Sequence, residues 1–425
     1  MEKRVFLKNM ALLSGFASLD SPVNKIEELL VYAKDKNPAD LAVDEVYWAK
    51  YRKLYRLNPA HINLESGYYN ILPEEILEQH IKHIREVNLQ GAYYMRTAQV
   101  ANREKATSQV AELMGCSVKE LTLTRNTTES LDMIIGGYPW KSGDEAVMAQ
   151  QDYPAMLDMF KMVAKRYGVK NNVVSLPLDP ASDDELVALY ANAITPKTKL
   201  LLISHVVNIS GQVMPVKKIC QMAHEKGVEV MVDGAHAVAQ LIYTLPELGC
   251  DYYGASLHKW LAVPLGVGML YVKKEKIAKI WPLIAEAEFP GEEFDIKRLS
   301  HLGTHPVHAH LAISSSIEFY KKMGPENKLA RLRYLQNYWT SRVRNIPNVL
   351  MNTPKDPART CAIANVGIKG MATKDLATKL LDKYGIYTVG IDNSNVHGCR
   401  ITANVFTSTA ELDVLVKAIK EMATV

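Results

Sequence analysis

Two residues of opposite charge follow two predicted β-strands in the middle of the chain. The apolar run 228–232 predicts a buried strand, and Asp233 comes directly after it. A second apolar run, 252–257, ends in His258 and Lys259. Because a lone buried carboxylate or ammonium is costly, each needs a partner. A helix cap and a solvated lysine are the simpler interpretation of the two charges.

A lysine amine and an aspartate in one site are also the pair that a pyridoxal phosphate (PLP) cofactor requires. The amine of Lys259 would bond covalently to the cofactor aldehyde. Asp233 would pair with the pyridine nitrogen and keep it protonated, so that the ring can withdraw electrons. The two residues therefore predict a PLP site at the ends of the two strands.

The sequence DGAH, which begins at Asp233, is followed by SLHK and by a glycine-rich approach to a third strand at 269–272. This order of motifs resembles the class V aminotransferase family of fold-type I PLP enzymes. The family includes isopenicillin N epimerases, cysteine desulfurases, C–S lyases and kynureninases. The resemblance runs from about Leu64 to the C-terminus.

The predicted fold class is α/β. Strands and helices alternate from about Ala101, which predicts a mostly parallel sheet with helices on both faces and ligands beyond its carboxyl edge. The resemblance implies a sheet of the seven-stranded type and a smaller α+β domain. We expect an N-terminal helical segment (1–60) that packs with the small domain, a large PLP-binding domain (61–312) and a small C-terminal domain (313–425).

Thr127 and Thr128 stand at the start of a predicted helix. Hydroxyl side chains there cap free N–H groups, and the helix dipole also favours an anion at this end. Capping alone is the simpler interpretation. The family binds the cofactor phosphate at this place in the chain, and the resemblance adds His258 and Ser256 on the phosphate side.

Three further residues match positions around the cofactor ring. Tyr153 stands where the family has an aromatic residue or histidine that stacks on the ring. Asn208 resembles the asparagine that bonds the phenolic oxygen, and His236 resembles a second group near that oxygen. A core tyrosine and a core histidine are the alternatives.

The resemblance also implies residues on the substrate side. Arg400 resembles the arginine that grips the substrate α-carboxylate with its planar fork, the alternative being a surface ion pair. Tyr68 and Asn70 lie in a segment that covers the cofactor in the family, although an ordinary loop fits them equally. Gly303-Thr304 resembles the pair that reaches the neighbouring site, which implies a homodimer with shared sites.

Several functional classes are excluded or disfavoured. Net charge is +4 with scattered Lys and Arg and no recognition motif, so we expect no nucleic-acid partner. The spacing of the histidines from His301 to His310 fits no metal site. The chain has five cysteines, and none falls in the segment 390–398, where a desulfurase carries its nucleophile on a flexible loop. A persulfide-forming desulfurase is therefore disfavoured.

The N-terminus allows two interpretations. The sequence KRVFLK at 3–8, followed by a weakly apolar stretch, resembles a degenerate twin-arginine export signal within residues 1–20. An amphipathic helix is the favoured alternative. We accordingly expect a cytoplasmic protein, with a periplasmic one as the alternative, and no membrane span.

The sequence thus predicts a PLP enzyme that acts on an amino acid or an amino-acid derivative through a Cα carbanion. The order of motifs is closest to the isopenicillin N epimerase-like branch. C–S lyase (β-elimination) and aminotransferase activities share the carbanion step and stay open. A degenerate ligand-binding protein of the same fold is the non-enzyme alternative.

Overall fold

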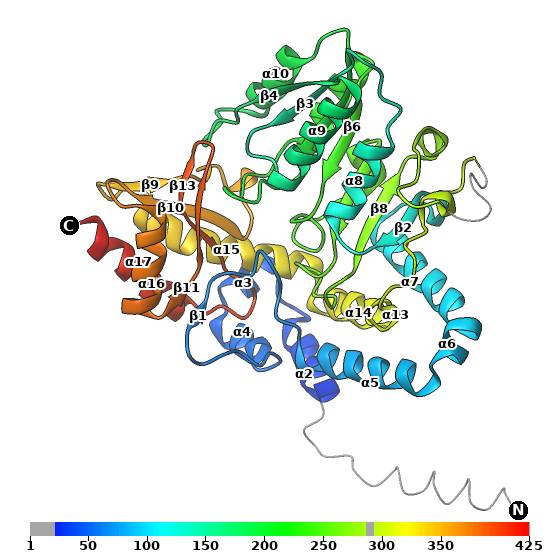
Figure 1. The fold of residues 1–425 in the computed structure, drawn as a ribbon. Coiled ribbons are helices and arrows are strands. Elements are labelled where there is room, and N and C mark those ends of the chain that lie inside the picture. Colours follow the sequence, from blue (N-terminus) through cyan, green and yellow to red (C-terminus); the bar gives the residue numbers. More distant parts are fainter. Residues whose placement is uncertain (1–21, 286–292, 425) are drawn as a thin grey trace, which may run out of the picture.

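A seven-stranded sheet forms the centre of the computed structural model, which describes residues 22–285 and 293–424 (Figure 1). The predicted export segment, 1–20, lies outside the described residues. The strand order is β2-β8-β7-β6-β5-β3-β4. The strands are β2 (Leu121–Thr124), β3 (Glu145–Ala149), β4 (Lys170–Val174), β5 (Thr198–Ser204), β6 (Glu229–Asp233), β7 (Tyr252–Ser256) and β8 (Gly268–Val272).

The sheet is mostly parallel, as predicted. Strands β4, β3, β5, β6 and β7 pair in parallel, whereas β8 is antiparallel to both of its neighbours. The register places Ser204 opposite Asp233, so the carboxyl ends of β5 and β6 meet at one edge. Ligands of open α/β sheets bind at this edge.

Helices cover both faces of the sheet, because successive strand residues enter two separate cores. Leu201 and Ile203 of β5 join one apolar cluster, and Leu200 and Leu202 join the other. The sequences of fully buried strands of this kind are continuous apolar runs. The helices of this region are α7 (Gln99–Met114), α8 (Thr127–Gly137), α9 (Pro154–Tyr167), α10 (Asp183–Ala193), α11 (Val216–Glu225), α12 (Leu245–Leu248), α13 (Val307–Leu311) and α14 (Ile313–Met323).

A second, antiparallel sheet has the order β12-β13-β10-β9 and its own apolar core. Its strands are β9 (Val349–Met351), β10 (Ile363–Ile368), β12 (Val389–Asn393) and β13 (Val396–Thr402). Its helices are α15 (Pro325–Val343), α16 (Thr373–Tyr384) and α17 (Thr409–Ala423).

Short 3₁₀ helices also occur along the described chain. They are η1 (Val118–Glu120), η2 (Lys274–Lys279), η3 (Ile296–Leu299) and η4 (Pro357–Arg359).

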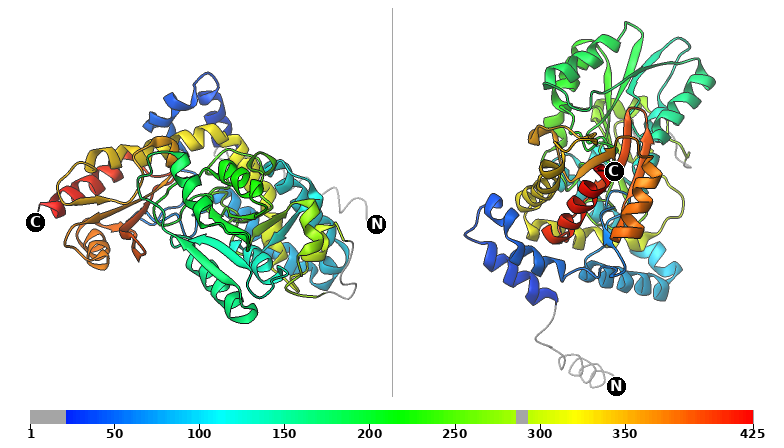
Figure 2. Two further views of the ribbon diagram at one scale, coloured as in Figure 1. Left: turned by 90° about the horizontal axis from the view of Figure 1, so that it is seen from above. Right: turned by 90° about the vertical axis from the view of Figure 1, so that its left-hand side faces the viewer.

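The described N-terminal segment packs against α15 and β11 (Ile386–Tyr387), and its apolar side chains, such as Trp48 and Tyr51, join the apolar cluster that includes Leu201 and Ile203 of the large sheet. The segment contains α2 (Pro22–Ala33), α3 (Pro38–Val43), α4 (Glu45–Arg52) and β1 (Ile62–Asn63), and β1 pairs in parallel with β11. Arg331 of α15 donates to the carbonyl of Ala42 at 2.9 Å. The views in Figure 2 show these blue helices beside the yellow α15.

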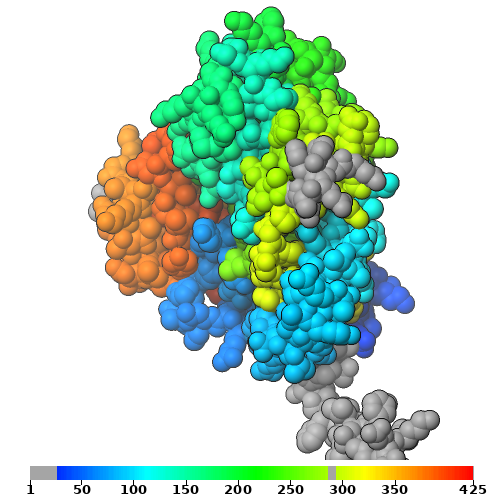
Figure 3. Space-filling view, turned by 45° about the vertical axis from the view of Figure 1, so that its right-hand side comes forward, coloured from blue at the N-terminus to red at the C-terminus, as the bar shows by residue number. Residues whose placement is uncertain are grey.

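The chain then crosses to the large sheet through α5 (Glu74–Gln90) and α6 (Ala92–Thr97). Helix α5 contacts α13, and Figure 3 shows the cyan surface of α5 and α6 beside the yellow segment that includes α13. Large apolar side chains lie exposed at Leu89 of α5, Tyr93 of α6 and Val100 near the start of α7.

Residues 390–398, where a desulfurase carries its flexible loop, form the hairpin of β12 and β13 in this chain. Its turn contains Ser394, which has a positive φ of 57°. A side chain at Gly398 would meet Oδ1 of Asn365 at 2.5 Å. This glycine therefore permits close packing of neighbouring strands rather than a loop.

Candidate active site

A cavity of about 290 Å³ opens at the carboxyl edge of the large sheet. It collects most of the predicted site residues from segments far apart in the chain. The predicted residues that line it are Tyr68, Thr127, Thr128, Tyr153, Asn208, Asp233, His236, Ser256, His258, Lys259 and Arg400.

Lys259 and Asp233 are buried in this cavity. Asp233 is the last residue of β6 and accepts from the backbone N–H of Ala235 at 2.9 Å. Burial raises the pKa of Asp233, while the Ala235 N–H and the charge of Lys259 act in the opposite direction. Burial lowers the pKa of Lys259 to about 8, against the opposing effect of Asp233. A lysine with this pKa supplies more neutral, nucleophilic amine near neutral pH than an ordinary lysine does.

His236 links Lys259 to Trp260. The indole Nε1–H of Trp260 donates to Nδ1 of His236 at 3.3 Å, and Nε2 of His236 lies 3.0 Å from Nζ of Lys259. An indole can only donate, so Nδ1 accepts, and the neutral ring carries its proton on Nε2. Burial holds the pKa of His236 well below its ordinary value. In this tautomer the histidine donates to the neutral form of the Lys259 amine.

The start of α8 forms one end of the cavity. The backbone N–H of Thr127 donates to Oγ of Ser256 at 2.9 Å, and the two hydroxyls lie 2.7 Å apart. The helix cap is Asn126, which accepts from the N–H of Glu129 at 2.9 Å. The side chain of Thr127 is thus not needed as the cap. Nδ1 of His258 is buried without a partner in the described structure. This end offers N–H and O–H donors and a helix N-terminus to an anion.

Tyr153 and Asn208 line the same cavity from two other loops. Tyr153 directly precedes Pro154 at the start of α9 and is partly exposed. Oδ1 of Asn208 is buried and has no hydrogen-bond partner in the described structure. Buried polar atoms without partners are uncommon, and a polar ligand group explains this one.

Arg400 points into the cavity from β13 and is paired with Glu65. Nη2 of Arg400 lies 2.5 Å from Oε1 of Glu65, and Nε donates to Oε2 at 3.2 Å. Both side chains are almost fully buried, so the alternative of a surface ion pair is wrong. Cys399 faces the core of the second sheet, and burial raises its pKa to about 12.

Two predicted positions lie outside the cavity lining. Oδ1 of Asn70 accepts from Nδ2 of Asn404 at 2.7 Å, and its backbone N–H contacts the carbonyl of His258 at 3.4 Å. Asn70 therefore supports the loop beneath the site. Gly303 and Thr304 are exposed on the surface before α13.

Sequence reasoning missed other residues of the site. Arg125 and Asn126 line the cavity beside the threonines, and Ser204 lines it from the end of β5. Oγ of Ser204 donates at 2.7 Å to buried Asp152, and burial raises the pKa of Asp152 to about 7. The position of Ser204 at the end of an apolar run is a signal that could have revealed it.

These residues fit a PLP cofactor. A buried lysine and a buried aspartate lie at neighbouring strand ends, and a donor-rich helix start forms one end of the cavity. The unpartnered Oδ1 of Asn208 and Nδ1 of His258 leave polar atoms for a ligand. A cavity of this chemistry suits an anionic, aromatic molecule with polar ring substituents.

Residues 71–396 match the family model of aminotransferase class V. The chain belongs to this family. Its cofactor is therefore PLP and it is a PLP-dependent enzyme, as the sequence predicted. The non-enzyme alternative is set aside.

Curated relatives of this chain carry two different names. This chain is 26% identical over 387 residues to the isopenicillin N epimerase of Streptomyces clavuligerus, and the match covers 88% of this chain and 97% of the relative. This chain is also 26% identical over 381 residues to a probable cysteine desulfurase of Vibrio cholerae, and the match covers 84% of this chain and 92% of that relative.

A solved structure confirms the fold-type I architecture. A mutant of C-DES, with glycine covalently linked to its PLP cofactor, matches with a TM-score of 0.78 at 20% identity, over 87% of this chain and 99% of that one.

None of the described helices is long and apolar enough to cross a membrane.

Proposed function

We propose that this enzyme is isopenicillin N epimerase-like and inverts the α-carbon of an amino acid or amino-acid derivative. The observation that carries the proposal is the buried amine of Lys259, which lies 3.0 Å from Nε2 of His236 in a cavity that also contains Asp233 and Arg400. The curated relative named isopenicillin N epimerase supports the choice of branch.

Lys259 would hold the cofactor and then move the proton at the substrate α-carbon. When bound, PLP withdraws electrons from that carbon and makes its proton removable. Asp233, ionised beside the pyridine nitrogen, would keep that nitrogen protonated. Thr127, Ser256 and His258 would hold the phosphate, with Thr128 at the same helix start.

Four residues would fix the orientation of the cofactor and the substrate. The amide nitrogen Nδ2 of Asn208 would donate to the phenolic oxygen of the cofactor, and Tyr153 would stack on its ring. Arg400 would bind the substrate α-carboxylate through two parallel N–H donors. The exposed ring of Tyr68 lies at the mouth of the cavity, where it would cover a bound substrate.

Inversion needs a second proton group on the face opposite Lys259. His236 is bonded to Lys259 itself, so it lies on the lysine side and does not suit this role. Residues 390–398, a further candidate from the sequence, do not line the cavity, whereas Tyr153 lines it from a different loop of the wall. We assign the second proton transfer to Tyr153.

We also propose a homodimer with shared sites. The exposed Gly303-Thr304 segment does not reach the cavity of its own chain, and it would reach the phosphate of the partner. The exposed apolar side chains of Leu89 and Val100 lie on α5 and α7, which pack with α13, close in sequence to Thr304. A surface of this kind favours burial in an interface.

β-Elimination is the second candidate, because a curated relative is named a probable cysteine desulfurase. None of the five cysteines lines the cavity, so a lyase here would release its sulfur product without an enzyme persulfide.

The experiment incubates the holoenzyme with a panel of amino acids and dipeptide-like derivatives in deuterated water. Deuterium at the α-carbon with inverted configuration supports the proposal. Release of pyruvate or a thiol supports elimination instead. Conversion of the cofactor to its amine form, reversed by a keto acid, supports transamination. The variant Tyr153→Phe should exchange deuterium without inversion.

A further inference from the structure

Glu65 holds Arg400 by one edge of its guanidinium group. Nε and Nη2 of Arg400 face the two carboxylate oxygens of Glu65, and only 9% of the arginine and 6% of the glutamate side chain is exposed. The two residues are joined only by tertiary packing, because 335 positions separate them in the chain. The charge of Arg400 is therefore compensated before a ligand arrives.

Two further contacts fix the guanidinium. Nη1 of Arg400 donates to the carbonyl oxygen of Asn208 at 3.3 Å. A side chain at Gly67 would approach Cζ of Arg400 to 3.1 Å, so the backbone there packs close to the group. A guanidinium has five N–H donors, and Glu65 and Asn208 take three of them. One N–H on Nη1 and one on Nη2 remain, and this pair matches a carboxylate.

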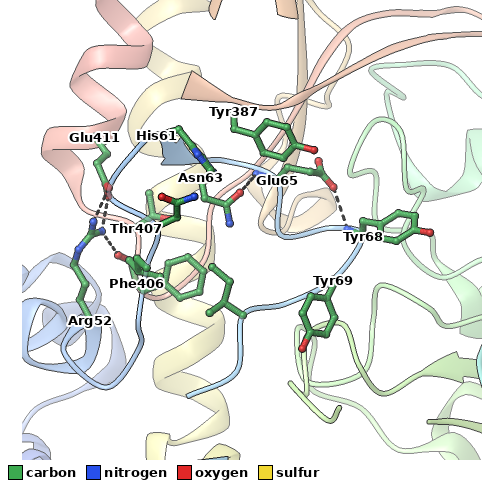
Figure 4. A pocket seen from close by; sticks show the side chains of 13 residues that line it. Arg52, His61, Asn63, Glu65, Tyr68, Tyr69, Tyr387, Phe406, Thr407 and Glu411 are labelled. Atoms are coloured by element: carbon green, nitrogen blue, oxygen red, sulfur yellow. Dashed lines mark hydrogen bonds and ion pairs between the residues drawn. The ribbon is translucent and has the colours of Figure 1, made fainter. Parts of the chain in front are cut away.

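Glu65 is itself held in place. Its backbone N–H donates to Oδ1 of Asn63 at 3.1 Å, and its Oε1 accepts from the backbone N–H of Tyr68 at 3.0 Å. Glu65 lines a second cavity, of about 320 Å³ (Figure 4). Arg400 lines the cavity of Lys259. The ion pair thus forms part of the wall between the two cavities, and Tyr68 lines both.

We propose that Glu65 is a positioning residue for Arg400, fixing the guanidinium so that its remaining edge receives the carboxylate of an amino-acid substrate. The inference rests on the proposed role of Arg400 in substrate binding. If Glu65 instead only blocked Arg400 and had to move away before the substrate bound, removing its carboxylate would raise the affinity for substrate.

The pair also acts on Lys259 through its charges. Burial lowers the pKa of Lys259 most, Asp233 raises it, Arg400 lowers it and Glu65 raises it. Loss of the Glu65 charge would leave Arg400 uncompensated and move the pKa of Lys259 further below about 8. The ionisable groups that face this amine are Asp233, His236, His258, Arg400 and Glu65.

The test compares Glu65→Gln with Glu65→Asp and with Arg52→Met. The control breaks another two-contact carboxylate pair, between Arg52 and Glu411, which Figure 4 shows at the far end of the second cavity. In Glu65→Gln we expect KM to rise roughly tenfold to a hundredfold with a smaller change in kcat, because a misdirected clamp loses binding. Glu65→Asp should recover part of the loss.

Two readouts separate positioning from a merely structural role. The inhibition constant of propionate should rise in Glu65→Gln by a similar factor, whereas that of propionamide should not change. The pH midpoint for covalent PLP uptake by the apoenzyme, trapped with borohydride, should fall in Glu65→Gln and stay unchanged in Arg52→Met. A lower KM, or an unchanged propionate constant, would overturn the inference.

A double-mutant cycle completes the test. In an Arg400→Met background, Glu65→Gln should have no further effect on the propionate constant, because Glu65 acts through Arg400. Additive effects would contradict positioning. If Arg400→Met alone leaves propionate binding unchanged, the proposed role of Arg400 fails. If Arg400→Met weakens binding but Glu65→Gln does not, only the role of Glu65 fails.

Discussion

The indole N–H of Trp260 donates to Nδ1 of His236 at 3.3 Å and thereby places the histidine proton on Nε2, which faces Lys259. Trp260 directly follows Lys259 in the chain, yet it acts on the lysine from the opposite side of the histidine ring. Two adjacent residues thus contact the same imidazole through its two nitrogen atoms.

The variant Trp260→Phe should raise the pH midpoint for PLP uptake by the apoenzyme. Without the indole donor, either nitrogen of His236 can carry the proton, so the neutral amine of Lys259 loses a fixed donor and becomes less favoured. The measurement is borohydride trapping across a pH series. Trp339→Phe, at a fully buried site in the core of the second sheet, controls for lost packing and should leave the midpoint unchanged.

Lys259 should carry the cofactor, and its attachment should follow a midpoint near pH 8. The folded pKa of about 8 lies below that of an ordinary lysine, so the reactive neutral amine is present above this pH. Below it, the attachment rate should fall about tenfold for each pH unit. Peptide mapping after reduction should place the adduct on Lys259. An adduct on Lys328, the other buried lysine with a lowered pKa, would show the assignment to be wrong.

Asp233→Asn should retain PLP but lower turnover by roughly a hundredfold or more, because a neutral amide does not hold the proton on the pyridine nitrogen. The measurement combines kcat with the cofactor content of the purified variant. Asp152→Asn is the matched control. It changes a neighbouring buried carboxylate that bonds Ser204 rather than lining the cavity, so we expect a smaller loss. Near-normal turnover in Asp233→Asn would mean that Asp233 is only a turn residue.

Shared sites predict complementation between two defective variants. Lys259→Ala should be inactive, and Thr304→Val should bind PLP weakly and be inactive at low cofactor concentration. In a mixed dimer, one site would combine both defects and the other would have Lys259 and the partner's Thr304 intact. Mixing after dissociation should therefore restore activity. If each site is built from one chain, mixing restores none.

The strand ends of the site could be predicted because they follow from apolar runs. Asp233 and Lys259 each end a run that is buried on both faces of the sheet, and the parallel order brings such ends to one edge. Local pattern and overall topology therefore agree at these positions. The start of β4 could not be predicted in this way, because its first residues, Lys170 to Asn172, give no apolar signal.

Other parts of the site depend on tertiary packing and leave no local signal. In the sequence, Glu65 has the pattern of an ordinary loop residue. In the structure, the pairing of β1 with β11 places it beside Arg400. Asn70 was expected to face the substrate, but its side chain is bonded to Asn404 from the far end of the chain. The 390–398 hairpin was missed because glycine and asparagine suggest flexibility, whereas Gly398 permits close strand contact.

The parallel pairing of β1 with β11 also determines when the molecule can be completed during synthesis. Ile62 pairs with Ile386, so this early strand leaves the ribosome long before its partner exists. The ion pairs of Arg52 with Glu411 and Glu65 with Arg400 likewise wait for the end of the chain. The large sheet can form first, while the substrate-facing wall closes last. Contacts between residues so far apart in the chain slow folding. The nascent enzyme therefore lacks the part of the cavity wall that contains Arg400 until translation is nearly complete.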